Sequence, residues 1–341
     1  MRGPCRPTHQ QTQAMIKKLT GLASIVALAS VAQAEVKINE NLSLDGYAIG
    51  SYSSVEGAAA PGQTTNDTFL DSGSRLFDSV KVAVNGTYGD FSGKVSVLLQ
   101  SVNNTSNESG GLLDAYLTYT AGSLAITGGK FNSWLGYESF DSPNNAFISY
   151  GLSGYVANYA TGAKVEYITD TLSAGVSVRD SLTAGDGFYQ GDGDFSDNLG
   201  YEAYVLYSGI DKLTLFAGAG FGDLDGGDLS TYNAWASYAF TEKFSLALEY
   251  AKTDDSTAAV FAGDVTNSWL LQGTYVVNDS VSVSGRVTAQ DTKAGDGLGY
   301  GVASTYTITE NFAVKGEVTK TDFNNGAGDV FTYAIQGLFK F

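Results

Sequence analysis

The chain has 341 residues, of which 43% are hydrophobic and 16% are charged, and its formal net charge is −17. Such acidity argues against a nucleic-acid partner, because phosphates require a basic protein surface. No stretch beyond the N-terminal region approaches the ~20 uninterrupted apolar residues that a membrane-spanning helix needs, so membrane residence would have to be by strands.

The start of the chain carries the pattern of a secretory signal. Two lysines precede an apolar run at 19–31, and Ala-Gln-Ala follows directly. A basic start, a short apolar core and an A-x-A site together predict a signal peptide over residues 15–34, cleaved after Ala34.

Cleavage at this site changes the chemistry of the chain. Residues 1–14 carry no targeting pattern and are interpreted as a spurious or disordered extension, which holds the only Cys and the only His, Cys5 and His9. The mature region, 35–341, then has 15 basic and 36 acidic residues and a formal charge of −21. Without thiols it can form neither disulfides nor thiolate metal sites. No linker or charge block interrupts it, which predicts one domain.

A strand–turn–strand unit recurs along the mature region. Each copy ends a strand in Tyr, passes through a tight turn, and continues into a second strand whose apolar and polar residues alternate. Alternation with period two indicates strands, because a helix would scatter these residues around its circumference. The seven copies begin at Tyr88, Tyr119, Tyr167, Tyr207, Tyr238, Tyr275 and Tyr306.

The seven short turns alternate with eight longer connections, so fifteen connections join about sixteen strands. An even strand number with short turns at one end and long loops at the other is typical of an all-β, antiparallel up-and-down barrel that crosses the bacterial outer membrane. The short turns would then be periplasmic and the long loops extracellular, around an aqueous lumen. The long connections lie near 53–74, 103–110, 132–156, 181–198, 222–228, 254–265, 291–297 and 322–329.

Parity within each strand assigns the two faces of the predicted barrel. Apolar sets such as Val281, Val283 and Val287 alternate with polar sets such as Ser284 and Arg286. A charge on the lipid face costs up to ~2–4 kcal/mol at mid-membrane, so the apolar sets are predicted to face lipid and the polar sets a wet lumen. The seven tyrosines share the apolar parity and are predicted to form an aromatic girdle at the headgroups. The alternative is that Tyr is merely a good strand former.

The last twelve residues alternate strictly, with Tyr333, Phe339 and Phe341 on the apolar face. A chain that stops on Phe at the end of such a strand resembles the C-terminal signature of outer-membrane barrels. This resemblance implies recognition by the barrel-assembly machinery and insertion into outer-membrane lipid. The terminal strand is expected to seal the ring, because a free aromatic edge strand invites edge-to-edge pairing.

A local motif adds a family resemblance. Residues 128–138 read GGKFNSWLGYE, and an insert at 139–154 follows with SPNN at its centre. This order resembles the OmpL-like beta-barrel porins, whose general form the region 35–341 matches. The resemblance implies a passive channel in the outer membrane of a Gram-negative-type bacterium. The PEFGG-type sequence of general trimeric porins is absent, so a monomer and a homo-oligomeric trimer both stay open.

The longest connection, 132–156, is the candidate for narrowing the lumen, because loops of this length are usually functional or disordered. Our hypothesis is that it folds inward and presents Glu138 and Asp141 opposite basic side chains of the wall, creating a transverse field that selects polar solutes. The alternative is an outward cap, with the wall charges solvated or paired with neighbouring acids. Parity places six bases on the wall: Lys81, Lys94, Lys164, Arg179, Arg286 and Lys315.

The long connections hold 20 acidic residues against one Lys. A negative mouth concentrates cations and repels anions, which predicts a mild cation preference, strongest at low salt. One of these loops, 191–198, begins like a calcium-binding loop, but it has Asp197 and Ala203 where such a loop requires Gly and Glu. A solvated acidic loop is therefore favoured over a calcium site, and no cofactor is expected.

These features favour a porin through which ions and small hydrophilic solutes diffuse. Catalysis is not expected, because the mature chain has no His to act as a general base and no phosphate-binding loop. The main alternative is a plugged structural or adhesive barrel, to which the inward parity of Leu206 and Trp235 lends slight support. A secreted β-sandwich or β-helix adhesin is disfavoured by the apolar outward faces.

Overall fold

The computed structural model describes residues 35–57, 68–69, 79–102, 107–151, 159–182, 195, 199–224, 227–255, 265–292, 296–324 and 328–341. The expected extension and signal peptide, 1–34, lie outside the described residues, as does the calcium-like segment 191–198 except for Phe195. Within the described ranges, no helix has the length and apolar character that a bilayer crossing demands.

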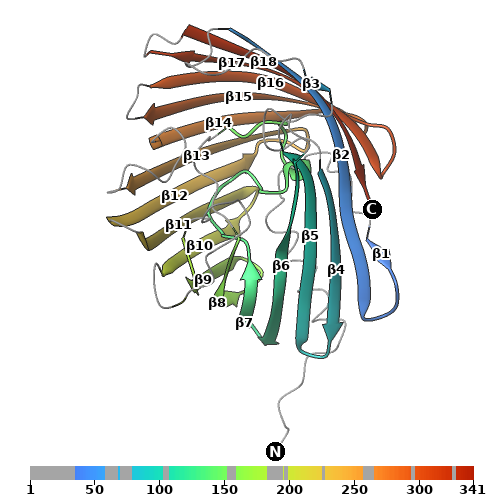
Figure 1. Cartoon of the computed structure of the whole chain (residues 1–341), viewed down its shortest axis with the longest axis vertical. Helices are drawn as coiled ribbons and strands as arrows, with labels where there is room; N and C mark the ends of the chain where they lie inside the picture. Colours follow the sequence, from blue (N-terminus) through green and yellow to red (C-terminus); the bar gives the residue numbers. More distant parts are fainter. Residues whose placement is uncertain are drawn as a thin grey trace, which may run out of the picture.

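Sixteen long strands form one antiparallel sheet that closes into a barrel (Figure 1). Two further strands of two residues, β1 (Val36–Lys37) and β3 (Thr68–Phe69), pair with β2, and a short 3-10 helix, η1 (Ser142–Asn144), lies between β7 and β8. The long strands are β2 (Leu42–Gly57), β4 (Ser79–Tyr88), β5 (Phe91–Val102), β6 (Asn107–Ala121), β7 (Leu124–Phe131), β8 (Ala160–Ile168), β9 (Leu172–Arg179), β10 (Gly200–Ile210), β11 (Leu213–Leu224), β12 (Gly227–Ala239), β13 (Phe244–Asp255), β14 (Val265–Asn278), β15 (Val281–Thr292), β16 (Gly297–Thr307), β17 (Phe312–Phe323) and β18 (Gly328–Lys340).

The ring closes between its first and last long strands. β18 pairs with β2 in an antiparallel ladder that runs from Val330 opposite Gly57 to Lys340 opposite Tyr47. An even number of up-and-down strands makes this closing pair antiparallel, and closure gives each of the sixteen long strands a partner on both sides. The sequence prediction of a sixteen-stranded antiparallel barrel is confirmed.

The seven short turns lie where the repeated unit predicted them. Two of them use a glycine in the left-handed region, Gly89 with φ of 60° and Gly122 with φ of 62°, because a tight hairpin needs positive φ that glycine adopts without strain. The turn between β10 and β11 places Lys212 in the same region, with φ of 61°.

Some predicted long connections are shorter than the sequence suggested. The connection predicted at 222–228 leaves only residues 225–226 between β11 and β12, because the ladder continues through Asp223 opposite Asp228. Similarly, β6 begins at Asn107, inside the connection predicted at 103–110. These segments lack apolar alternation, so their strand character comes from pairing with a neighbour and not from their own pattern.

Exposure separates the two faces as parity predicted. Val283 and Val287 on β15 are 38% and 40% exposed, whereas Ser284 and Arg286 between them are 3% and 6% exposed. The outside of the sheet is therefore apolar and uncovered, and the inside carries most of the polar side chains.

Candidate functional site

The long loop after β7, described over residues 132–151, contacts the inner side of the barrel. In Figure 1 this segment, coloured green between β7 and β8, lies within the outline of the barrel. Its hydrogen bonds reach inward-facing side chains on strands from β8 round to β4, among them Glu166, Tyr47 and Lys81. The loop is therefore held by many strands that lie far from it in sequence.

The first part of the long loop packs into an aromatic cluster on β10, β11 and β12. Phe216 and Trp235 stand opposite each other in the ladder with their rings 5.3 Å apart and nearly parallel, and Tyr204 stacks on Phe216 at 6.0 Å. The loop residues Trp134 and Tyr137 cover the two ends of this row, at 4.6 Å from Tyr204 and 5.6 Å from Trp235. Because loop rings contact both ends of this stacked row, the cluster anchors the loop.

Buried carboxylates of the wall bind the backbone of the same part of the loop. Glu202 accepts hydrogen bonds from the Trp134 amide at 3.4 Å and from the Ser133 hydroxyl at 2.6 Å, and Glu249 accepts one of 2.8 Å from the Tyr137 amide. Glu202 also pairs with Arg179 on β9, and both side chains are almost fully buried. Backbone N–H groups that a loop cannot pair internally are satisfied in this way.

A buried ion pair joins the second part of the loop to β15. Arg286 donates to Glu138 at 2.9 Å and to the Ser149 carbonyl at 2.8 Å, and its guanidinium lies 4.0 Å from the centre of the Phe147 ring. Burial raises the pKa of the Glu138 carboxyl, although Arg286 opposes that rise. Removing either partner of such a buried pair is destabilising, because the other charge stays buried without compensation.

Lysines of β4 and β17 hold the centre of the loop around η1. Lys81 pairs with Asp141 at 2.7 Å, and the Tyr47 hydroxyl donates to the same carboxylate at 3.3 Å. Lys315 donates to the carbonyls of three loop residues that include Asn145, at 2.5 Å. Next to it, Glu317 accepts from the amides of Ile148 and Ser149.

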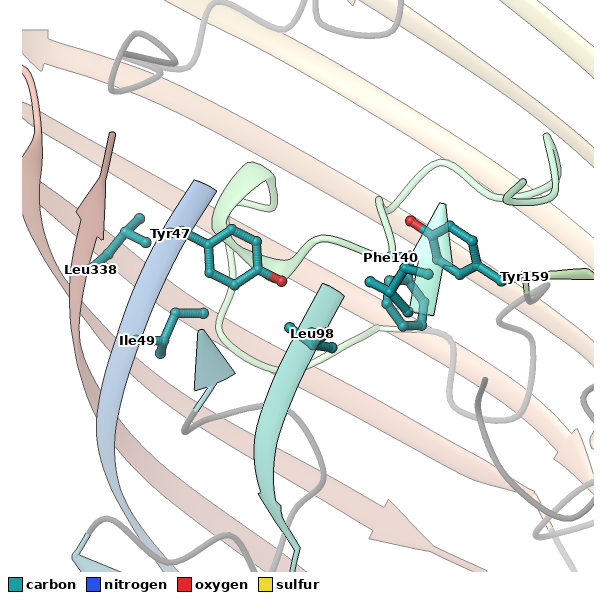
Figure 2. Close-up of a cluster of buried hydrophobic side chains, with 7 residues drawn as sticks. Tyr47, Ile49, Leu98, Phe140, Tyr159 and Leu338 are labelled. Atoms are coloured by element: carbon teal, nitrogen blue, oxygen red, sulfur yellow. The ribbon is translucent and has the colours of Figure 1, made fainter. Parts of the chain in front are cut away.

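A second apolar cluster surrounds Phe140 of the long loop. It combines inward residues of four strands with Tyr159, which stands just before β8 (Figure 2). Figure 2 shows Phe140 beside Tyr159, and the two rings meet edge to face at 5.1 Å. The cluster members are Tyr47, Ile49, Leu98, Leu113, Phe140, Tyr159 and Leu338.

The remaining predicted wall bases also lie beside carboxylates. Lys164 is 3.1 Å from Glu166, and Lys94 is 3.9 Å from Asp45. All six predicted wall bases are thus inward and at most partly exposed. The two predicted loop acids touch their bases directly, so the charges that were expected to face each other across the lumen form contact pairs.

The tyrosines of the expected girdle all lie outward at the short-turn ends of their strands. Their exposed fractions run from 37% for Tyr207 to 80% for Tyr88, and Tyr119 packs on Phe91 at 5.1 Å. At the C-terminus Tyr333 and Phe339 are 41% and 45% exposed, and the Phe339 and Phe341 rings lie 6.1 Å apart.

Sequence reasoning missed several inward residues that contact the loop, among them Asn233 and Lys340. Asn233 donates to Glu249 and accepts from the Gly136 amide, and Lys340 approaches Asn144 at 3.4 Å. Parity alone puts both side chains inward, so the signal was present. What parity does not reveal is where along the barrel the loop meets them.

Comparison with known proteins assigns this architecture to a family. The model of the family described as "Putative beta-barrel porin-2, OmpL-like" matches residues 79–333, which is more than half of the chain. The chain belongs to this family. Membership makes this OmpL-like porin an outer-membrane protein of a bacterium, as the sequence predicted.

Solved structures share the fold of this OmpL-like porin at low sequence identity. A triple mutant of Rhodopseudomonas blastica porin is 17% identical, with a TM-score of 0.57 over 88% of this chain and 100% of that one. Pseudomonas putida OprB, solved at high pH, is 11% identical, with a TM-score of 0.66 over 88% of this chain and 94% of that one. No curated protein matches the chain.

Proposed function

We propose that this OmpL-like porin lets ions and small hydrophilic solutes diffuse passively across the outer membrane, without catalysis. The observation that carries the proposal is the two-faced wall, apolar and exposed outside and polar inside, in a ring of sixteen strands. A ring of this size leaves room for an aqueous path, because interior side chains fill barrels of about eight strands but not much larger ones.

The long loop would narrow this path. Support comes from its contacts with the wall, since a segment held by Arg286, Glu317 and Glu202 occupies lumen that would otherwise be free. The test is single-channel conductance in planar bilayers of the mature chain and of a variant that lacks residues 139–150. The deletion should raise conductance. Equal conductance of the two proteins would count against the constriction.

A mild cation preference is the second part of the proposal. It rests on the acidic composition of the long connections, most of which we expect to lie at the mouth of the channel. The reversal potential in a salt gradient should show cation preference that weakens as ionic strength rises, because screening shortens the reach of these charges. Anion preference at low salt would refute it.

A plugged structural barrel is the second candidate. It is favoured by the two apolar clusters between loop and wall, because Leu206 and Trp235 pack against the cluster that contains Leu135 of the long loop. Swelling of liposomes in small sugars separates the two functions. Rapid swelling supports the porin, whereas liposomes that stay impermeable to sugars and also show no ion conductance support the plug.

A further inference from the structure

A Lys-Thr-Asp unit recurs near the ends of two strands that lie four strands apart in the ring. Residues 252–254 form it on β13, and residues 320–322 form it on β17. In both strands the lysine follows, by eight residues, the phenylalanine that opens the strand. The two units therefore stand at equivalent places on the barrel wall, on the side of the long loops.

The two charged residues of each unit lie on the outer face of the barrel. Lys252 stands directly opposite Tyr232 in the ladder, and Tyr232 is 41% exposed. Lys320 stands directly opposite Tyr300, which is 45% exposed. Residues directly opposite each other in an antiparallel pair share a face. The threonine between the charges has the other parity, and Thr253 is only 8% exposed.

The height of the units matches a headgroup layer. Phe244, which opens β13, stands opposite Tyr275 of the expected girdle, and eight residues of strand separate it from Lys252. Eight residues span ~26 Å, which a strand tilt of ~40° reduces to about 20 Å of height, against ~25 Å for the apolar band of a transmembrane barrel. The apolar stem of a lysine carries its ammonium over the remaining distance.

Each unit presents opposite charges side by side. Lys252 pairs with Asp254 at 2.7 Å, whereas Lys320 pairs with Asp322 at 2.5 Å and with Asp329 of β18 at 2.9 Å. These five side chains are 33–54% exposed. Exposed ion pairs are worth only ~0–1 kcal/mol, so their members can exchange for charges of a ligand. Because carboxylates equal or outnumber the lysine in each unit, a fitting ligand must carry both signs.

We propose that each Lys-Thr-Asp unit binds the headgroup of a membrane lipid that carries a phosphate and a primary ammonium group, as phosphoethanolamine does. The lysine donates to the phosphate, and the aspartate accepts from the ammonium; such charge-assisted hydrogen bonds are short and strong. The tyrosine opposite each lysine places its ring beside the upper part of the lipid tails. This inference concerns anchoring in lipid, so it stands or falls apart from conductance.

Lipid binding is tested with the refolded mature chain in maltoside detergent, to which phosphatidylethanolamine is added, and bound lipids are counted by native mass spectrometry. The parent chain should retain two molecules. Lys252→Gln and Lys320→Gln should each retain one, because losing a charge-assisted hydrogen bond weakens the changed site about tenfold. The double variant should retain none. Without added lipid, both substitutions should leave the urea midpoint unchanged, because the pairs that they break are exposed.

Other lipids identify the headgroup chemistry. Phosphatidylcholine keeps the phosphate but has no N–H group for the aspartate, and phosphatidylglycerol has no cation, so both should bind more weakly than phosphatidylethanolamine. In the Lys320→Gln background, Asp254→Asn should remove the preference for phosphatidylethanolamine over phosphatidylcholine. Equal retention of phosphatidylethanolamine and of diacylglycerol, which has no headgroup charge, would mean that only acyl chains are bound and would overturn the proposal.

Lys243→Gln is the matched control, because it removes one exposed positive charge at the opposite end of β13, where no aspartate stands two residues further on. It should retain two molecules of phosphatidylethanolamine, as the parent chain does. Loss of one lipid in this control, two lipids in Lys252→Gln, or no lipid on the parent chain would each refute the proposed sites.

Discussion

The loop anchor at Arg286 gives the sharpest test of how the loop is held. Replacing Arg286 with Met keeps an unbranched apolar stem but removes the ion pair to Glu138, two hydrogen bonds to Ser149 and the contact with the Phe147 ring. The Arg286 and Glu138 side chains are only 5% and 8% exposed, so solvent screens their attraction little.

The size of the effect follows from the carboxylate that stays behind. Breaking a buried pair by removing one partner costs about 3–5 kcal/mol, because the remaining charge is uncompensated. If this cost falls on the anchored state of the loop, the ratio of detached to anchored loop rises on the order of 10²–10⁴-fold. Limited chymotrypsin digestion of the folded barrel measures that fraction, since Tyr137, Phe140, Phe147 and Tyr150 become cleavable when the loop detaches.

The double variant Glu138→Gln with Arg286→Met is the control, and it should be cleaved more slowly than the single variant because no buried charge remains. The single variant should also depend on pH. Burial raises the pKa of Glu138 and Arg286 opposes this rise, so the pKa rises further without Arg286. The faster cleavage of Arg286→Met is then fully present above the pKa of Glu138. It diminishes as the pH falls through this pKa, because the Glu138 carboxyl becomes neutral. Cleavage of Arg286→Met at the parent rate would refute the anchor.

Three further predictions concern the barrel itself. Gly46→Val should lower the yield of folded barrel on an unboiled gel, because a side chain there would meet the Lys81 backbone carbonyl and the Phe341 ring, whereas Gly285→Ala, with open space around it, should not; equal yields would contradict this close packing at Gly46. Glu202→Gln should destabilise the folded barrel by about 3–5 kcal/mol in urea unfolding, because Arg179 loses its buried carboxylate. Lys320→Gln, at an exposed cluster of charges, should have no measurable effect. Equal urea midpoints for the two variants would contradict this prediction. Val287→Arg at the middle of β15 should lower the free energy of unfolding by about 2–4 kcal/mol, and Tyr306→Arg at the end of β16 by about 0–1 kcal/mol, because an arginine that faces lipid costs most at the bilayer midplane. Equal losses of stability would count against the headgroup position predicted for the tyrosine girdle.

The sequence by itself determined the barrel, because each strand carries its own evidence. In β15, apolar Val283 and Val287 alternate with Ser284 and Arg286, and this alternation fixes which side faces lipid whatever the neighbouring strand contains. The tight turns are equally local, since Gly89 and Gly122 supply the positive φ that a short hairpin needs.

Only the tertiary structure decided what the long loop contacts. Parity placed Arg286 and Lys315 inside, but it cannot say that Glu138 meets the first and the Asn145 carbonyl the second, because those pairs are 148 and 170 residues apart. Such contacts depend on the strand register around the whole ring and on the path of a loop without periodic pattern. The same limit hid the contact between Lys340 and Asn144, which becomes evident only when β18 and the loop are brought together.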